Sequence, residues 1–183
     1  MMNYFVDSGL KSYLDIFSKN NDPEQKVMFD IEDLVRLHKL VRERKPFTTL
    51  EFGVGFSTIT ICHALKLNKS EFDSLNKKSK IRNTKLFQHY VVDSHKYWLE
   101  NTKSNFPNDL LEFVQFNFSK VYITTLSDLQ VCSLYKDIPD VVAEFIYLDG
   151  PNPKDVEGNI NGISFQCEER TVISGDMLLL EST

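Results

Sequence analysis

Apolar residues recur at helical spacing through the first part of the chain. A short amphipathic helix over 8–19 is predicted by four apolar positions, Leu10, Tyr13, Leu14 and Phe17. A second apolar stripe follows, and Asp22 and Pro23 predict its start, because aspartate caps helices and proline suits the first helical position. Pro46 predicts that this helix stops just before it. We therefore expect an N-terminal helical segment over 1–45 that packs on the core.

Beyond Pro46 the pattern changes to short buried runs typical of strands. Strands are predicted at 48–52 and 89–93, somewhere within 113–125, and at 145–149. A glycine turn and a helix over 57–65 separate the first two, which makes the opening half of a βαβ unit. We expect an α/β fold with a Rossmann-like, mainly parallel sheet in the order 3-2-1-4, flanked by helices, within a domain spanning 46–183.

Four other segments have weaker patterns. Residues 66–85 are rich in Lys, Asn and Ser and predict a surface insertion, and 150–170 predicts a long polar loop. Residues 97–105 predict a helix that Ser94 can cap. Residues 175–181 suit either a strand or a helix, and a crossover after the fourth strand favours a helix.

Composition places the chain among ordinary packed proteins. It has 183 residues, 42% hydrophobic and 26% charged, so one domain is the default. No run of eighteen apolar residues predicts a membrane span, and the N-terminus does not resemble a secretory signal. The three widely separated cysteines suggest a reducing compartment, so we expect a cytoplasmic protein.

Charge is distributed unevenly along the chain. The formal net charge is −5, which argues against nucleic acid as a partner. The 66–85 stretch carries seven Lys and Arg against Glu71 and Asp73, or +5, so the remainder carries −10. The stretch can steer an anion or an acidic partner, although a solvated surface loop is the simpler interpretation.

The strongest chemical signal is the segment between the first strand and its helix. Gly53 and Gly55 allow a sharp turn and a close backbone approach to a ligand. Ser57 begins a helix whose free N–H groups face the turn. Glu51, at the tip of the strand, supplies a carboxylate that can accept a hydrogen bond from an ammonium or a hydroxyl.

A second acid follows the second strand. Asp93 is placed to accept hydrogen bonds from both hydroxyls of a ribose, although it can also cap the next helix. The dinucleotide pattern Gly-x-Gly-x-x-Gly/Ala is broken by Thr58, and no cation lies in the turn to hold a diphosphate. An acidic Glu51 suits a cationic ligand, so the pattern favours S-adenosylmethionine as the cofactor.

These segments resemble a known family. LEFGVGFST resembles the first motif of class I S-adenosylmethionine-dependent methyltransferases, acid-x-Gly-x-Gly, and VVDSH and FIYLDGP resemble the motifs of their second and fourth strands. The run from PDVVAEFIYLDG to GDMLLLE is similar to a group of small, poorly characterised bacterial methyltransferases, some of which are encoded near polysaccharide genes. The resemblance spans about 46–183.

The resemblance implies roles for individual residues. Glu51 takes the amino acid portion of the cofactor, Gly53 and Gly55 give it room beside Ser57, and Asp93 holds the ribose. Asp149 lies near the methyl group and the acceptor.

Asp149 and His95 are the candidate catalytic residues. Asp149 can orient the acceptor hydroxyl, act as a general base or hold a divalent metal, and it can also simply form a turn with Gly150. His95 is a candidate base at the mouth of the site, or a surface residue in the first turn of a helix. A metal needs partners such as Asp155 and Asp176, and we assign no metal ligand.

We therefore expect methyl transfer from S-adenosylmethionine to an oxygen or nitrogen of a small molecule or sugar. Two alternatives stay open: a non-catalytic or truncated remnant of the fold, and a nicotinamide-dependent oxidoreductase. The chain ends at Thr183, before the fifth strand that family members have, so we expect a fragment of a longer enzyme or a truncated fold. Homo-oligomerisation is compatible with these expectations.

Overall fold

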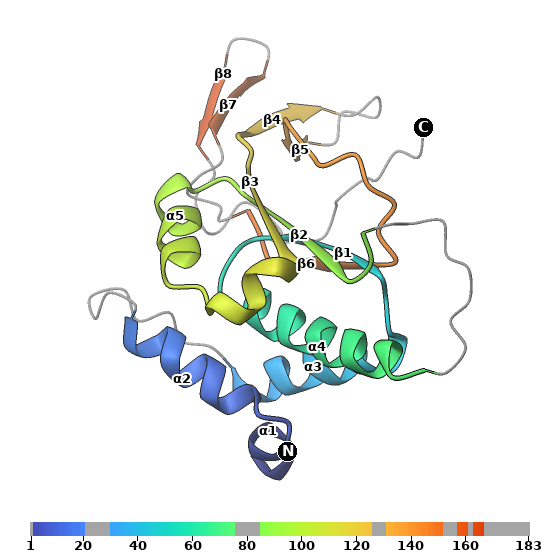
Figure 1. Cartoon of the computed structure of the whole chain (residues 1–183). Helices are drawn as coiled ribbons and strands as arrows, with labels where there is room; N and C mark the ends of the chain where they lie inside the picture. Colours follow the sequence, from blue (N-terminus) through green and yellow to red (C-terminus); the bar gives the residue numbers. More distant parts are fainter. Residues whose placement is uncertain are drawn as a thin grey trace.

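The computed structural model describes residues 2–20, 30–75, 85–125, 131–151, 157–160 and 163–166. Figure 1 shows the arrangement of its elements. The helices are α1 Met2–Asp7, α2 Leu10–Asn20, α3 Ile31–Arg44, α4 Phe56–Asp73, α5 Lys96–Ser104 and the 3-10 helix η2 Asn108–Phe113. The strands are β1 Thr48–Phe52, β2 Gln88–Asp93, β3 Val114–Phe118, β4 Val121–Thr125, β5 Val131–Tyr135, β6 Phe145–Leu148, β7 Glu157–Ile160 and β8 Ile163–Gln166.

The main sheet has four parallel strands in the order β3-β2-β1-β6. This confirms the parallel order predicted for the four strands of the sequence analysis, which are β1, β2, β3 and β6 in the structure. The arrangement is consistent with a Rossmann-like fold. β1 lies inside the sheet and all five of its residues are buried, which is why its sequence shows no alternation of apolar and polar residues. The predicted strand boundaries at 48–52 and 89–93 agree with β1 and β2 to within one residue.

The helices α1 to α4 gather on one side of this sheet (Figure 1). α4 is buried along most of its length, because it packs against the sheet on one side and α3 on the other. The N-terminal helices contribute apolar side chains to the same core, including Phe5, Leu10, Leu14, Phe17, Val35 and Val41. A smaller core on the opposite face of the sheet contains Leu50, Phe52, Val92 and Tyr135.

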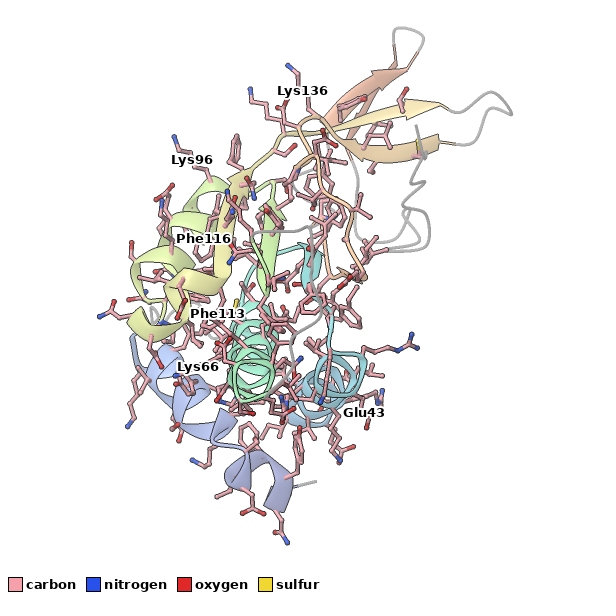
Figure 2. The ribbon with its side chains drawn as sticks, turned by 45° about the vertical axis from the view of Figure 1, so that its right-hand side comes forward. Glu43, Lys66, Lys96, Phe113, Phe116 and Lys136 are labelled. Atoms are coloured by element: carbon pink, nitrogen blue, oxygen red, sulfur yellow. The ribbon has the colours of Figure 1, made fainter. Side chains whose placement is uncertain are left out.

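A second sheet has the order β5-β4-β7-β8 and lies at the end of the molecule away from α1 and α2 (Figures 1 and 2). The strand predicted within 113–125 is confirmed as β3, and the same run also contains β4, which belongs to the second sheet. One expectation was wrong here. The predicted polar loop at 150–170 contains the antiparallel pair β7 and β8, whose pairing does not depend on an apolar pattern.

Several predicted helix boundaries also differ from the structure. Asp30, in extended conformation, caps α3, which begins at Ile31. The helix start predicted at Asp22 and Pro23 lies outside the described residues. α4 begins at Phe56, one residue before Ser57, with Gly55 at the cap. The helix then continues into the basic stretch as far as Asp73. Its buried first part stabilises it, and residues with good helix propensity, such as lysine and glutamate, extend it.

The cap of α5 was predicted one residue too early. The carboxylate of Asp93 accepts a hydrogen bond from the backbone N–H of His95, and this tight turn moves the cap to His95. His95 Nδ1 then accepts from the N–H of Trp98. Ser94 Oγ is buried and makes no hydrogen bond within the described ranges. The helix predicted at 175–181 lies outside the described residues.

None of the helices in the described part of the chain combines the length and apolar character needed to cross a membrane.

Candidate functional site

Glu51, Asp93 and Asp149 lie on three neighbouring strands, at or just beyond their carboxyl ends. β1 pairs with β2 on one side and with β6 on the other, so that Phe52 lies beside both Val92 and Leu148. The strand order reverses between β1 and β6, and ligands of open α/β sheets bind outside the carboxyl ends at such a reversal. Lys96 and Lys136, which follow β2 and β5, lie toward the end of the molecule that carries the second sheet (Figure 2).

Gly53 makes the turn out of β1 at this position. Its N–H donates to the carbonyl of Val92, and its φ of +102° lies in the region that favours glycine. A Cβ at this position would lie 2.8 Å from the carbonyl oxygen of Asp149 and 2.9 Å from its carbonyl carbon. The turn after β1 therefore lies so close to the backbone just beyond β6 that only glycine fits at position 53.

Gly55 differs from Gly53, because a Cβ on it would meet no atom within 4 Å. Gly55 is the N-cap residue of α4. Because glycine has no side chain, it makes no side-chain hydrogen bond to the N–H groups in the first turn of the helix. Its own N–H donates to Thr58 Oγ1 at 3.0 Å. Ser57 is buried in the first turn of α4.

Glu51 is completely buried beneath this turn, at 0% exposure. Its Oε2 atom accepts two hydrogen bonds, from Thr58 Oγ1 at 2.7 Å and from His89 Nε2 at 2.8 Å. Its Oε1 atom is buried and accepts none from the described residues. A buried carboxylate oxygen without a donor is costly, so this atom is suited to a donor that a ligand brings.

His89 extends this network into the sheet. It is fully buried, and its Nδ1 lies 2.8 Å from the Thr49 hydroxyl. Thr49 and His89 are neighbours in the parallel register of β1 and β2, so their side chains share one face of the sheet with Glu51. A continuous chain of hydrogen bonds therefore runs from the glycine turn through Thr58, Glu51 and His89 to Thr49.

Negative charge accumulates around Asp149. The residue is exposed, but desolvation by surrounding protein atoms raises the pKa of its carboxyl, and the charge of Glu51 raises it further. Tyr147, beside Glu51 in the register, has its pKa raised to about 12 by burial and then by Asp149, Glu51 and Asp33. A cation at this edge of the sheet would relieve this repulsion.

Asp93 and His95 are both engaged in the turn that begins α5. Asp93 is half-buried at the end of β2, and its Oδ1 lies 2.6 Å from the His95 nitrogen. His95 uses Nδ1 as the helix cap, and its ring lies 6.3 Å from that of Trp98 and 6.4 Å from that of Tyr97. The structure therefore gives His95 a local role in the helix start.

Sequence reasoning overlooked three residues of this region: His89, Thr58 and Tyr147. His89 looked like an ordinary residue of a buried strand, and Thr58 was considered only as a departure from the dinucleotide pattern. One signal could have revealed His89, because a histidine inside an otherwise apolar buried strand needs a polar partner.

Metal-binding residues do not gather in the described ranges, where no three His, Cys, Asp or Glu side chains come together. Asp155 and Asp176, the partners considered for a metal at Asp149, lie outside these ranges. Comparisons with models of known protein families, with curated proteins and with solved structures found no match for the chain.

Proposed function

We propose that the chain binds S-adenosylmethionine at the carboxyl ends of β1, β2 and β6 and transfers its methyl group to an oxygen or nitrogen of a small molecule or sugar. The observation that carries this proposal is the buried Oε1 atom of Glu51, which lacks a donor among the described residues. An ammonium group supplies such a donor, and the amino acid portion of this cofactor contains one.

The electrostatics of the site favour a cation over a phosphate. The pKa of Asp149 is raised first by desolvation and then by the negative charge of Glu51, so the two carboxylates repel each other. A dinucleotide would bring a diphosphate to this edge, whereas S-adenosylmethionine brings an ammonium and a sulfonium. The same charge pattern therefore makes a nicotinamide cofactor a poor fit.

Each residue then has a defined task. Glu51 binds the ammonium, Gly53 and Gly55 let the backbone approach the ligand, Ser57 lies at the start of α4, and Asp93 binds the ribose hydroxyls. The cofactor supplies a methyl group on a positively charged sulfur; the acceptor's lone pair takes the methyl carbon while the electrons of the carbon–sulfur bond stay on sulfur. Asp149 orients the acceptor and takes its proton, with His95 at the rim of the site.

Calorimetric titration of the folded chain with S-adenosylmethionine and S-adenosylhomocysteine tests the proposal. We expect saturable binding of both ligands, and no binding of NAD. Glu51→Gln should weaken both adenosyl ligands by roughly 10-fold or more, because it removes a charge-assisted hydrogen bond of about 1.5–3 kcal/mol. A folded chain that binds neither adenosyl ligand would rule the proposal out and favour a non-catalytic protein.

A further inference from the structure

The two carboxylate oxygens of Glu51 differ in their hydrogen bonds. Both donors, Thr58 Oγ1 and His89 Nε2, bind Oε2, while Oε1 has no donor in the described ranges. Two donors on the same oxygen fix the rotation of the carboxylate about its last bond. The unused oxygen is thereby held in one direction.

His89 is held as firmly as the carboxylate that it binds. A carboxylate oxygen only accepts, so the Nε2 atom of His89 carries a proton and donates. The other ring nitrogen is bonded to the Thr49 hydroxyl, which also lies 3.5 Å from the carbonyl of Gln88. With both nitrogens engaged and no exposed surface, the imidazole has a single orientation.

We propose that His89 is a positioning residue of the ligand site: it holds Oε2 of Glu51 so that Oε1 meets the ammonium of the cofactor. This inference rests on the function proposed above. His89 does not touch the ligand itself; it acts through Glu51, 38 positions earlier in the chain. Thr58 shares the task from the side of α4.

A ligand pair separates positioning from simple support of the fold. S-adenosylhomocysteine contains the amino acid ammonium, whereas 5′-methylthioadenosine lacks the whole amino acid portion. We expect His89→Leu to weaken S-adenosylhomocysteine by about 10-fold or more, which corresponds to about 1.4 kcal/mol. The dissociation constant for 5′-methylthioadenosine should stay within about twofold of the wild-type value, because Glu51 does not contribute to its binding.

A conservative variant provides the rescue. His89→Gln keeps an N–H donor near the position of Nε2, so it should recover most of the affinity for S-adenosylhomocysteine. If His89→Leu does not fold by circular dichroism, Thr58→Val and Thr58→Ser give the same comparison from the other donor of Oε2. The Val variant should lose affinity selectively and the Ser variant should retain it.

The outcomes distinguish this inference from the proposed function. If the wild type binds neither S-adenosylhomocysteine nor S-adenosylmethionine, both fail. If the wild type binds and the His89 variants bind both ligands as the wild type does, or lose both ligands equally, only the positioning role of His89 is refuted. Selective loss of S-adenosylhomocysteine affinity, restored by glutamine, supports it.

Discussion

Gly53 and Asp149 lie in direct backbone contact, although 96 positions separate them in the chain. A Cβ on Gly53 would collide with the Asp149 carbonyl, at 2.8 Å from its oxygen. This contact joins the turn after β1 to the end of β6, where the strand order of the sheet reverses. It therefore sets the local shape of the candidate site.

Gly53→Ala should destabilise the protein by about 2–4 kcal/mol. The positive φ of Gly53 disfavours an L side chain by about 1–2 kcal/mol, and the collision with backbone atoms adds a packing penalty. Urea unfolding measures the loss. An unchanged free energy of unfolding would show that the turn adapts without cost.

Gly55→Ala is the matched substitution for the ligand site. A Cβ at this position meets no protein atom, so the free energy of unfolding should fall by less than about 1 kcal/mol, mainly through the poorer helix cap. Binding of S-adenosylhomocysteine should weaken by about 10-fold if the ligand comes close to this backbone. Wild-type affinity in calorimetry would exclude close contact at Gly55.

Thr58→Val should cost about 1–3 kcal/mol of stability. The Thr58 hydroxyl is fully buried, accepts from the N–H of Gly55 and donates to Glu51. The isosteric valine therefore leaves the Gly55 N–H without this acceptor and leaves Oε2 of Glu51 with His89 as its remaining donor. Thr58→Ser keeps the hydroxyl and should cost less. Equal unfolding midpoints for the two variants in urea would show that the hydroxyl does not matter.

The free energy of unfolding should fall as the pH is lowered from about 6.5 towards 4. Burial lowers the pKa of His38 to about 3 and that of His63 to about 4, and their rings are hydrogen-bonded to each other at 2.9 Å. Because the unfolded chain then binds more protons than the folded one, stability rises with pH up to the unfolded value near 6.5. Each histidine contributes a slope of up to about 1.4 kcal/mol per pH unit.

His63→Asn checks this assignment, because it removes one titrating group and keeps a polar group near Nδ1. We expect lower stability at pH 7 but a shallower dependence below pH 6.5, measured by urea unfolding at a series of pH values. An acid slope as steep as that of the wild type would show that other groups cause the acid sensitivity.

Asp149→Asn should weaken S-adenosylmethionine more than S-adenosylhomocysteine, because only the former carries a positive sulfur. We expect about a 3- to 10-fold loss for the charged ligand and less than about twofold for the neutral one. The free protein should not lose stability, since a raised folded-state pKa means that the ionised Asp149 opposes folding at neutral pH.

Calorimetry measures the dissociation constants of both ligands, and a thermal melt measures the stability of the free protein. Asp15→Asn, which removes an exposed carboxylate on α2, is the control for a general loss of negative charge. Equal weakening of both ligands by Asp149→Asn would place Asp149 away from the sulfur.

Much of the main sheet could be predicted, because its signals are local. The change from helical spacing to short buried strands occurs within a few residues, and glycine directly after β1 marks the turn into α4. The parallel arrangement follows, since a helix between two strands carries the chain back across the sheet. The cap of α5 was missed by one residue, because the Asp93 carboxylate binds the His95 N–H and moves the cap to His95.

The second sheet and the network beneath Glu51 could not be predicted in the same way. β7 and β8 are short, and β4 joins them through pairing that no local pattern encodes. Glu51 was recognised as a candidate ligand residue, but its commitment to His89 and Thr58 depends on two strands and a helix coming together.

Local chemistry thus settles which segments become strands and helices, and it places acids next to glycines at the strand tips. The tertiary structure determines which atoms of these acids accept hydrogen bonds from other residues of the chain. One oxygen of Glu51 has two donors and the other has none among the described residues, because a neighbouring strand and a helix start both approach the same side of the carboxylate. Hydrogen bonds between residues distant in sequence form only when the packed core brings them within 3 Å, and no short pattern along the chain records that approach.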